Sequence, residues 1–222
     1  MTRPQALVVS GGGRHGDPWH PFPATSAALA TALQERGVDA TVQDDADAAL
    51  AALDPAALPD LLVLNIGWYG TERFTAAAAD AWVAALRAGL PTLVAHSSLT
   101  AFPDWALWRE VVGGGWVHDT TYHPDYADGV ALARPGHPLV AGLDRLAIRD
   151  ERYTRLHVDP ASAVFLEHEE EGERHALGWT RTWGASRLVA DALGHDADSY
   201  GAAGRRTLLD RELAWLLAPA TS

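Results

Sequence analysis

The chain has 222 residues, of which 48% are hydrophobic, and a formal net charge of −12 at pH 7. This composition is typical of a globular protein and allows one domain over residues 1–222. No segment approaches the roughly 18 apolar residues that a membrane-spanning helix needs. The negative charge disfavours nucleic acid and anionic membranes as partners, because both repel an acidic surface.

Two residue types are absent. The sequence has no cysteine, and all 17 basic residues are arginine. Disulfides, thiolate ligands, a cysteine nucleophile and a Schiff-base lysine are therefore excluded. The amino terminus enters a predicted strand without the features of a signal peptide, so we expect a cytoplasmic protein.

The first half of the chain predicts alternating strands and helices. Apolar runs and cap residues predict strands over 5–10, 38–43, 61–65 and 91–95, and helices over 23–36, 46–53 and 75–88. The run over 61–65 is apolar throughout, as in a strand buried on both faces. Such alternation favours a doubly wound parallel sheet with right-handed crossovers.

The second half has a different pattern, with short apolar segments separated by turn residues. It predicts strands over 129–133, 146–148, 163–169, 174–181 and 186–190, and a last helix over 203–217. We expect these strands to form antiparallel hairpins that extend the sheet. The acidic run over 167–173 is expected to be a solvated hairpin tip.

The loop after the first strand contains glycines 11, 13 and 16 in the G-x-G-x-x-G spacing of dinucleotide-binding proteins. In that motif the third glycine begins a helix, whereas here prolines at 18, 21 and 23 prolong the loop. The spacing is therefore disfavoured as a dinucleotide site. A serine nucleophile at Ser97 or Ser98 is also disfavoured, because the glycines of a nucleophile elbow are absent.

Histidines follow several predicted strands. Ligands of open α/β sheets bind at the carboxyl ends of the strands, where such loops gather. No zinc signature is present, but His20, His96, His118 and His195 are candidates for an open metal site if they converge. The other interpretation is that they bind substrate hydroxyls or pack within the loops.

Asp150 and Glu151 lie next to each other between two predicted strands. Adjacent residues of an extended chain point to opposite sides. We therefore expect one of the two acids to enter a site.

The chain carries an ordered set of short motifs: the glycine-histidine loop after strand one, Pro91–Ser98 as a G-x-P-x-x-x-x-H-S strand, Gly113-Gly114 with His118, His137-Pro138-Leu139, Asp150-Glu151-x-Tyr153, Gly178-Trp179, Gly184-x-x-Arg187 and Leu193-Gly194-His195. This ordered set resembles the ThuA-like family, a branch of the class I glutamine amidotransferase-like superfamily. The order extends over residues 6–217. The resemblance implies a flavodoxin-like three-layer sandwich with a mostly parallel sheet and an antiparallel extension.

The resemblance also implies a role in sugar metabolism, on a disaccharide or its keto derivative. It does not imply glutaminase chemistry, because His96-Ser97-Ser98 stands where that superfamily has its catalytic cysteine. The expected reaction is proton transfer next to a carbonyl, leading to isomerisation, elimination or hydrolysis. The alternative is a non-catalytic sugar-binding or assembly module that keeps the fold.

With cysteine and lysine absent, the remaining residue types suggest a role for each residue of the candidate site. Glu151 is the expected base, with His96, His118 and His195 as electrophile, proton shuttle or ligand. The expected substrate-binding residues are His15, Trp19, His20, Ser97, Trp116 and Tyr153. The sequence requires no cofactor and leaves open both a divalent metal and a homo-oligomer.

Overall fold

The computed structural model describes residues 2–67 and 73–219. Its centre is one nine-stranded sheet. The strands run in the order β2 (Asp39–Gln43), β1 (Gln5–Ser10), β3 (Leu61–Asn65), β4 (Thr92–Ala95), β11 (Ser186–Asp191), β10 (Glu173–Trp183), β9 (Ala163–Glu170), β6 (Ala127–Ala133) and β7 (Arg145–Asp150).

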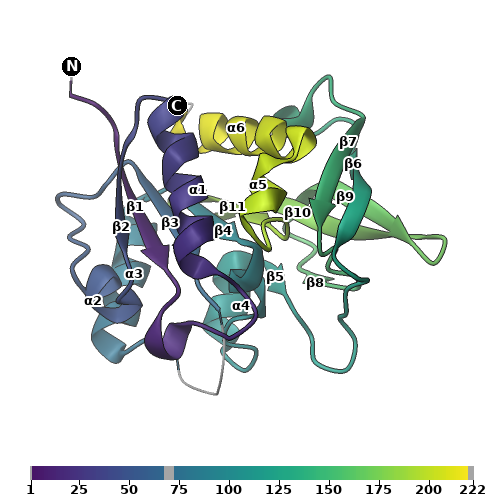
Figure 1. The fold of residues 1–222 in the computed structure, drawn as a ribbon. Coiled ribbons are helices and arrows are strands. Elements are labelled where there is room, and N and C mark those ends of the chain that lie inside the picture. The colour runs from purple at the N-terminus through teal and green to yellow at the C-terminus, as the bar shows by residue number, and fades with distance from the viewer. Residues whose placement is uncertain (1, 68–72, 220–222) are drawn as a thin grey trace.

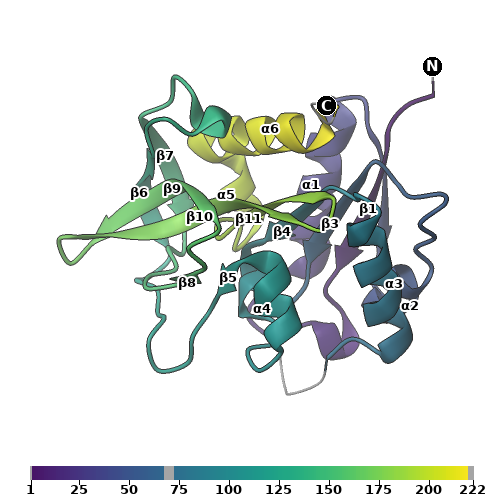
Figure 2. The same cartoon turned by 180° about the vertical axis from the view of Figure 1, so that it is seen from behind.

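The first five strands of this order pair parallel with one another. One face of the sheet carries α1 (Phe22–Glu35), α5 (Ala197–Gly201) and α6 (Ala203–Leu217), and the other carries α2 (Ala46–Ala51), α3 (Ala76–Arg87) and α4 (Ala106–Val112) (Figures 1 and 2). Every residue of β3 and β4 is buried, as expected of strands covered on both faces. The predicted three-layer α/β architecture is confirmed.

The remaining strands form the predicted antiparallel extension, in which β10, β9, β6 and β7 pair antiparallel in turn. The β9–β10 hairpin turns at Glu171 and Gly172, whose φ angles of 54° and 80° suit a two-residue hairpin loop. It projects away from the helices (Figure 1). Short strands β5 (Gly114–Gly115) and β8 (His157–Val158) pair separately below it.

The main differences from the predicted elements concern β11, α4 and α5. Strand β11 pairs parallel with β4 as well as antiparallel with β10, so it joins the two halves of the sheet. Helix α4 was not predicted, because no side chain caps its N-terminus at Trp105. Helix α5 was also not predicted, although Asp196 and Ser199 form a capping box at its start.

Three short 3-10 turns complete the chain: η1 (Gly13–His15), η2 (His96–Thr100) and η3 (Pro138–Val140). Within the described ranges, no helix combines the length and apolar character needed to cross a membrane.

Candidate active site

His96 makes a sharp turn at the carboxyl end of β4. Its φ of 38° lies in the left-handed region, where a residue other than glycine is strained by about 1 kcal/mol or more. The fully buried imidazole is held on both sides. Its Nδ1 donates to the carbonyl oxygen of Ala192 at 2.7 Å, so Nε2 carries the lone pair and accepts from the Tyr153 hydroxyl at 3.1 Å. These contacts allow the turn without the glycines of a nucleophile elbow.

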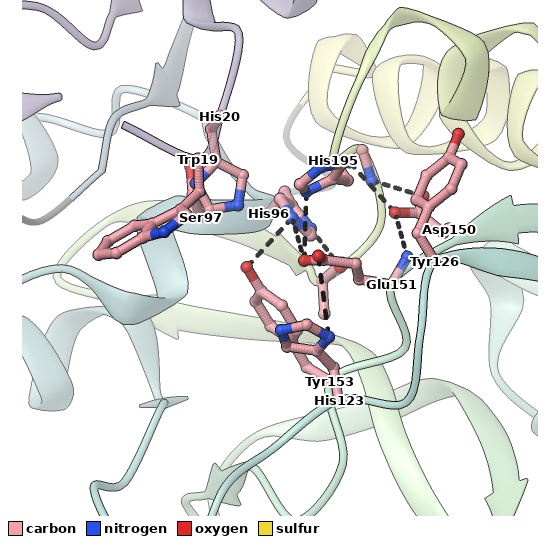
Figure 3. Close-up of polar contacts among 12 residues, drawn as sticks. Trp19, His20, His96, Ser97, His123, Tyr126, Asp150, Glu151, Tyr153 and His195 are labelled. Carbon is pink, nitrogen blue, oxygen red and sulfur yellow. Dashed lines mark hydrogen bonds and ion pairs between the residues drawn. The ribbon is translucent and has the colours of Figure 1, made fainter. Parts of the chain in front are cut away.

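Four side chains from distant parts of the chain converge here (Figure 3). They are His20, His96, Glu151 and His195, and each offers one atom so that the four atoms lie within 4.8 Å of one another. His20 comes from the loop before α1, His96 follows β4, Glu151 follows β7 and His195 follows β11. We call these four residues the His-Glu cluster.

Glu151 is the centre of the cluster's charge interactions. Its Oε2 lies 3.2 Å from His195 Nδ1 and 3.8 Å from His96 Nε2, while Oε1 lies 3.7 Å from His123 Nδ1. Burial acts to raise the pKa of Glu151, but the contact with His195 and the positive charge of the surrounding histidines outweigh it and lower that pKa. Glu151 is therefore ionised at neutral pH.

The histidines around Glu151 differ in charge. Contact with the Glu151 carboxylate raises the pKa of His195 above its ordinary value. Burial, reinforced by the neighbouring charge of His20, holds the pKa of His96 well below its ordinary value. The cluster thus combines a neutral imidazole, a carboxylate and an imidazole that favours its protonated form.

Asp17 fixes the orientation of His20. Both Asp17 carboxylate oxygens lie 2.8 Å from His20 Nδ1, and the backbone N–H groups of Trp19 and His20 donate to Oδ1. The Asp17 side chain is 2% exposed. A Cβ on Gly67 would come within 2.2 Å of Asp17 Oδ2, so a glycine there permits the close approach.

Asp150 precedes Glu151 in the chain and does not line the pocket. Its carboxylate accepts hydrogen bonds from the backbone N–H groups of Glu151, Gly194 and His195 at 2.7–3.1 Å. Burial raises the pKa of Asp150 to about 7. As predicted for adjacent acids, Asp150 and Glu151 have different environments: Asp150 holds the loop after β11, and Glu151 faces the site.

A pocket of about 400 Å³ opens onto Glu151. It is lined by Asp17, Trp19, His20, Thr100, Trp116, His118, His123, Glu151 and Tyr153. Trp116 packs edge-on against Tyr153 with ring centroids 5.1 Å apart, and Tyr153 stacks on His96 at 4.6 Å. Burial raises the pKa of Tyr153 well above its ordinary value, so its hydroxyl remains a hydrogen-bond donor.

The structure separates the predicted site residues into four groups. Trp19, His20, Trp116, Glu151 and Tyr153 line the pocket, and His96 and His195 contact Glu151 from behind. His118 lines the pocket but is exposed and lies outside the His-Glu cluster.

His15 and Ser97 do not line the pocket. His15 Nε2 lies 2.9 Å from Asp47 Oδ2, and its ring packs against Phe74 and Phe102. The Ser97 hydroxyl donates to the Ile66 carbonyl at 2.9 Å, which ties the turn after β4 to the end of β3. Both side chains are buried and stabilise loops beside the site.

Sequence reasoning did not find His123 and Asp17 as parts of the site. No pattern in the sequence indicates His123, whose Nδ1 lies 3.7 Å from Glu151 Oε1. Asp17 stands three residues before His20, a spacing that allows a carboxylate to orient an imidazole, and this signal was present in the sequence.

Comparison with known proteins identifies the family of the chain and proteins of similar fold. A model of the trehalose utilisation family, ThuA, matches residues 5–216. The chain belongs to the ThuA family. Two protein structures described as ThuA-like share the fold of this chain. The one from Parabacteroides merdae has 17% identity and a TM-score of 0.82, covering 98% of this chain and 91% of its own.

The second ThuA-like structure, from Bacteroides uniformis, has 13% identity and a TM-score of 0.72, covering 97% of this chain and 93% of its own. A glutamine amidotransferase from Thermotoga maritima has 10% identity and a TM-score of 0.61, covering 98% of this chain and 99% of its own. This chain and the amidotransferase therefore share a fold, as the sequence predicts. No curated protein matches the chain significantly.

Proposed function

We propose that this ThuA-family chain is an enzyme that transfers a proton next to the carbonyl group of a keto sugar, with a keto-disaccharide as the preferred substrate. The observation that carries the proposal is the position of the ionised Glu151 carboxylate. It lines a pocket that contains two tryptophans, and it belongs to a cluster with three histidines. The family's role in trehalose utilisation supports the carbohydrate part.

The pocket suits a sugar ligand. A volume of about 400 Å³ lies within the roughly 300–1,000 Å³ of small-molecule sites. Trp19 and Trp116 offer flat aromatic faces, and Thr100, His118 and His123 offer polar groups for hydroxyls. Aromatic faces pack against the apolar side of a pyranose ring, and polar groups fix its orientation.

The site residues supply both parts of a proton transfer. A ketone acidifies the neighbouring C–H bond, so the Glu151 carboxylate can accept that proton while the C–H electron pair forms a carbon–carbon double bond. The carbonyl oxygen then becomes an enolate oxygen, and its negative charge is stabilised by the polar groups that line the pocket. In a 3-keto glycoside, the acidic C2–H lies between the ketone and the anomeric carbon.

Two products can follow from the same enolate. For isomerisation, the proton of the hydroxyl group on the neighbouring carbon moves to the enolate oxygen. Return of the abstracted proton to the former carbonyl carbon then completes the shift of the ketone to that neighbouring carbon. Departure of the glycosidic oxygen from C1, with a proton from an acid such as protonated Glu151, gives an elimination product. Both use only groups present in the pocket.

A panel of 3-keto glycosides tests the proposal. We expect turnover by the unmodified chain and a loss of at least about 100-fold in kcat for Glu151→Gln, because general acid–base catalysis contributes about 10²–10⁴-fold. Glu169→Gln is the control, since Glu169 is exposed on β9. Binding of keto glycosides without any turnover would instead support a non-catalytic sugar-binding module.

A further inference from the structure

One ring nitrogen of the His-Glu cluster, His20 Nε2, is buried without a hydrogen-bond partner in the described part of the chain. The His20 side chain is only 10% exposed. A second buried ring nitrogen, His195 Nδ1, has the Glu151 carboxylate as its contact, at 3.2 Å. Buried polar atoms without partners are rare. An unpartnered imidazole nitrogen beside a carboxylate and two further imidazoles is an arrangement that a bound cation would satisfy.

We propose that His20, His96, His195 and Glu151 together hold one divalent transition-metal ion of the zinc type. Each residue contributes one donor atom, and the four atoms lie within 4.8 Å of one another. Ligands about 2.0–2.2 Å from a tetrahedral zinc ion lie about 3.3–3.6 Å apart. The distances from Glu151 Oε2 to His195 Nδ1 and His96 Nε2, 3.2 and 3.8 Å, are close to this spacing.

The partners of the imidazoles prepare them as ligands. Asp17 holds Nδ1 of His20, and the Ala192 carbonyl oxygen holds Nδ1 of His96. Each partner keeps the hydrogen on Nδ1 and directs the lone pair of Nε2 into the cluster. A carboxylate or carbonyl behind a ligating histidine is the usual arrangement in metal sites.

The donor set selects the class of ion. Three imidazole nitrogens and one carboxylate oxygen suit Zn²⁺, Co²⁺ or Fe²⁺, whereas Mg²⁺ and Ca²⁺ prefer oxygen ligands. Three neutral imidazoles and one carboxylate leave a net positive charge on the bound ion. Such a site attracts an anionic or strongly polar ligand oxygen.

The metal site deepens the proposed function and partly rests on it. A bound ion would polarise the carbonyl oxygen of a ligand in the pocket. The Tyr153 hydroxyl, which donates to His96 Nε2 in this structure, would then be free to donate to that oxygen. Glu151 Oε1 faces His123, so one carboxylate oxygen remains available for a proton when Oε2 binds the ion.

Calorimetry with the chelator-treated chain tests the site, with ZnCl₂ as the titrant and MgCl₂ as the comparison. We expect one Zn²⁺ per chain and little response to Mg²⁺. His20→Gln and His195→Gln should each weaken Zn²⁺ binding at least about 10-fold, and Asp17→Asn should weaken it about 10–100-fold through the orientation of His20. His118→Gln is the matched control, because His118 lies in the same pocket but outside the cluster.

A second measurement needs no variant and so is independent of misfolding. The chelator-treated chain with Co²⁺ should develop the visible absorption of a tetrahedral cobalt site. The absence of binding, or equal loss of affinity in His118→Gln and His195→Gln, would overturn the metal site. Zn²⁺ binding without keto-sugar turnover would contradict only the proposed function, whereas turnover in a chain that binds no metal would contradict only this inference.

Discussion

Glu151 Oε2 lies 3.2 Å from His195 Nδ1 and thereby joins the end of β7 to the loop after β11. The contact crosses the junction between the parallel and antiparallel halves of the sheet. It brings an acid from the extension to the carboxyl ends of the parallel strands, where open α/β proteins bind their ligands. The antiparallel extension therefore contributes directly to the site.

Asp150→Asn should disturb this junction. The Asp150 carboxylate accepts hydrogen bonds from three backbone N–H groups. An amide in its place would direct an NH₂ group toward at least one of these N–H groups, where no hydrogen bond can form. We expect a loss of about 1–3 kcal/mol in the free energy of unfolding. We also expect a lower kcat on keto glycosides with little change in KM, because His195 and Glu151 lose their positions.

Urea unfolding and steady-state kinetics measure both effects. Asp128→Asn is the control, since Asp128 forms only a surface ion pair with Arg149. A fall in stability with unchanged kcat would show that Asp150 supports the fold without positioning the site.

Trp19→Ala should weaken substrate binding without affecting stability. Trp19 is 64% exposed and lines the pocket. Loss of a stacking face worth about 0.5–1.5 kcal/mol corresponds to an increase of about 2–10-fold in KM. Trp183→Ala, in which the removed ring lies away from the pocket, should leave KM unchanged. An unaltered KM in Trp19→Ala would place the sugar elsewhere.

Arg205→Met should be strongly destabilising. The fully buried Arg205 guanidinium lies 2.6 Å from Asp191 Oδ2 and 3.3 Å from Glu212 Oε2. Removing it leaves two buried carboxyl groups without their cation, a loss of about 3–5 kcal/mol in the free energy of unfolding. Replacing all three residues together (Asp191→Asn, Arg205→Met, Glu212→Gln) should recover a large part of the lost free energy of unfolding.

Chemical unfolding of both variants checks this expectation. Arg206→Met is the control, because Arg206 is exposed and its ion pair with Glu35 spans 3.7 Å. A loss below about 1 kcal/mol for Arg205→Met, the range of surface ion pairs, would contradict a structural role for the buried group.

His168 should give the stability a defined pH dependence. Burial lowers the pKa of His168 to about 4 from the ordinary 6.5. Between these values the unfolded chain binds a proton that the folded chain does not, so this contribution to stability is complete above pH 6.5 and is lost as the pH falls toward 4. His168→Gln should make the unfolding free energy less dependent on pH in this window, and His157→Gln, at an exposed site, should not.

The fold could be predicted largely from local patterns. The apolar runs of β1, β3 and β4 are each followed by turn residues. A parallel strand that is buried on both faces needs such a continuous apolar run, so these runs identify the parallel strands. The pairing of β11 with β4 could not be predicted in this way, since it joins residues 188–191 to 92–95 and depends on the assembled sheet. Helix α4 carries no cap signal and was missed for that reason.

The site could be predicted in part. His96, Glu151 and His195 follow predicted strands, and their convergence was expected from the rule that such loops gather at one edge. His15 and Ser97 follow strands as well, but hydrogen bonds to Asp47 and Ile66 turn them away from the pocket. Those partners lie far away in the sequence, and no local pattern indicates them.

Proton exchange at carbon tests the proposed chemistry most directly, because isomerisation and elimination both begin with it. A 3-keto glycoside is incubated with the chain in D₂O, and deuterium at the carbon next to the ketone is followed by proton NMR. We predict incorporation well above the spontaneous rate with the unmodified chain and with Glu169→Gln, and a return to the spontaneous rate with Glu151→Gln. Equal incorporation with Glu151→Gln and the unmodified chain, or none above the spontaneous rate with either, would contradict the assignment of Glu151 as the proton acceptor.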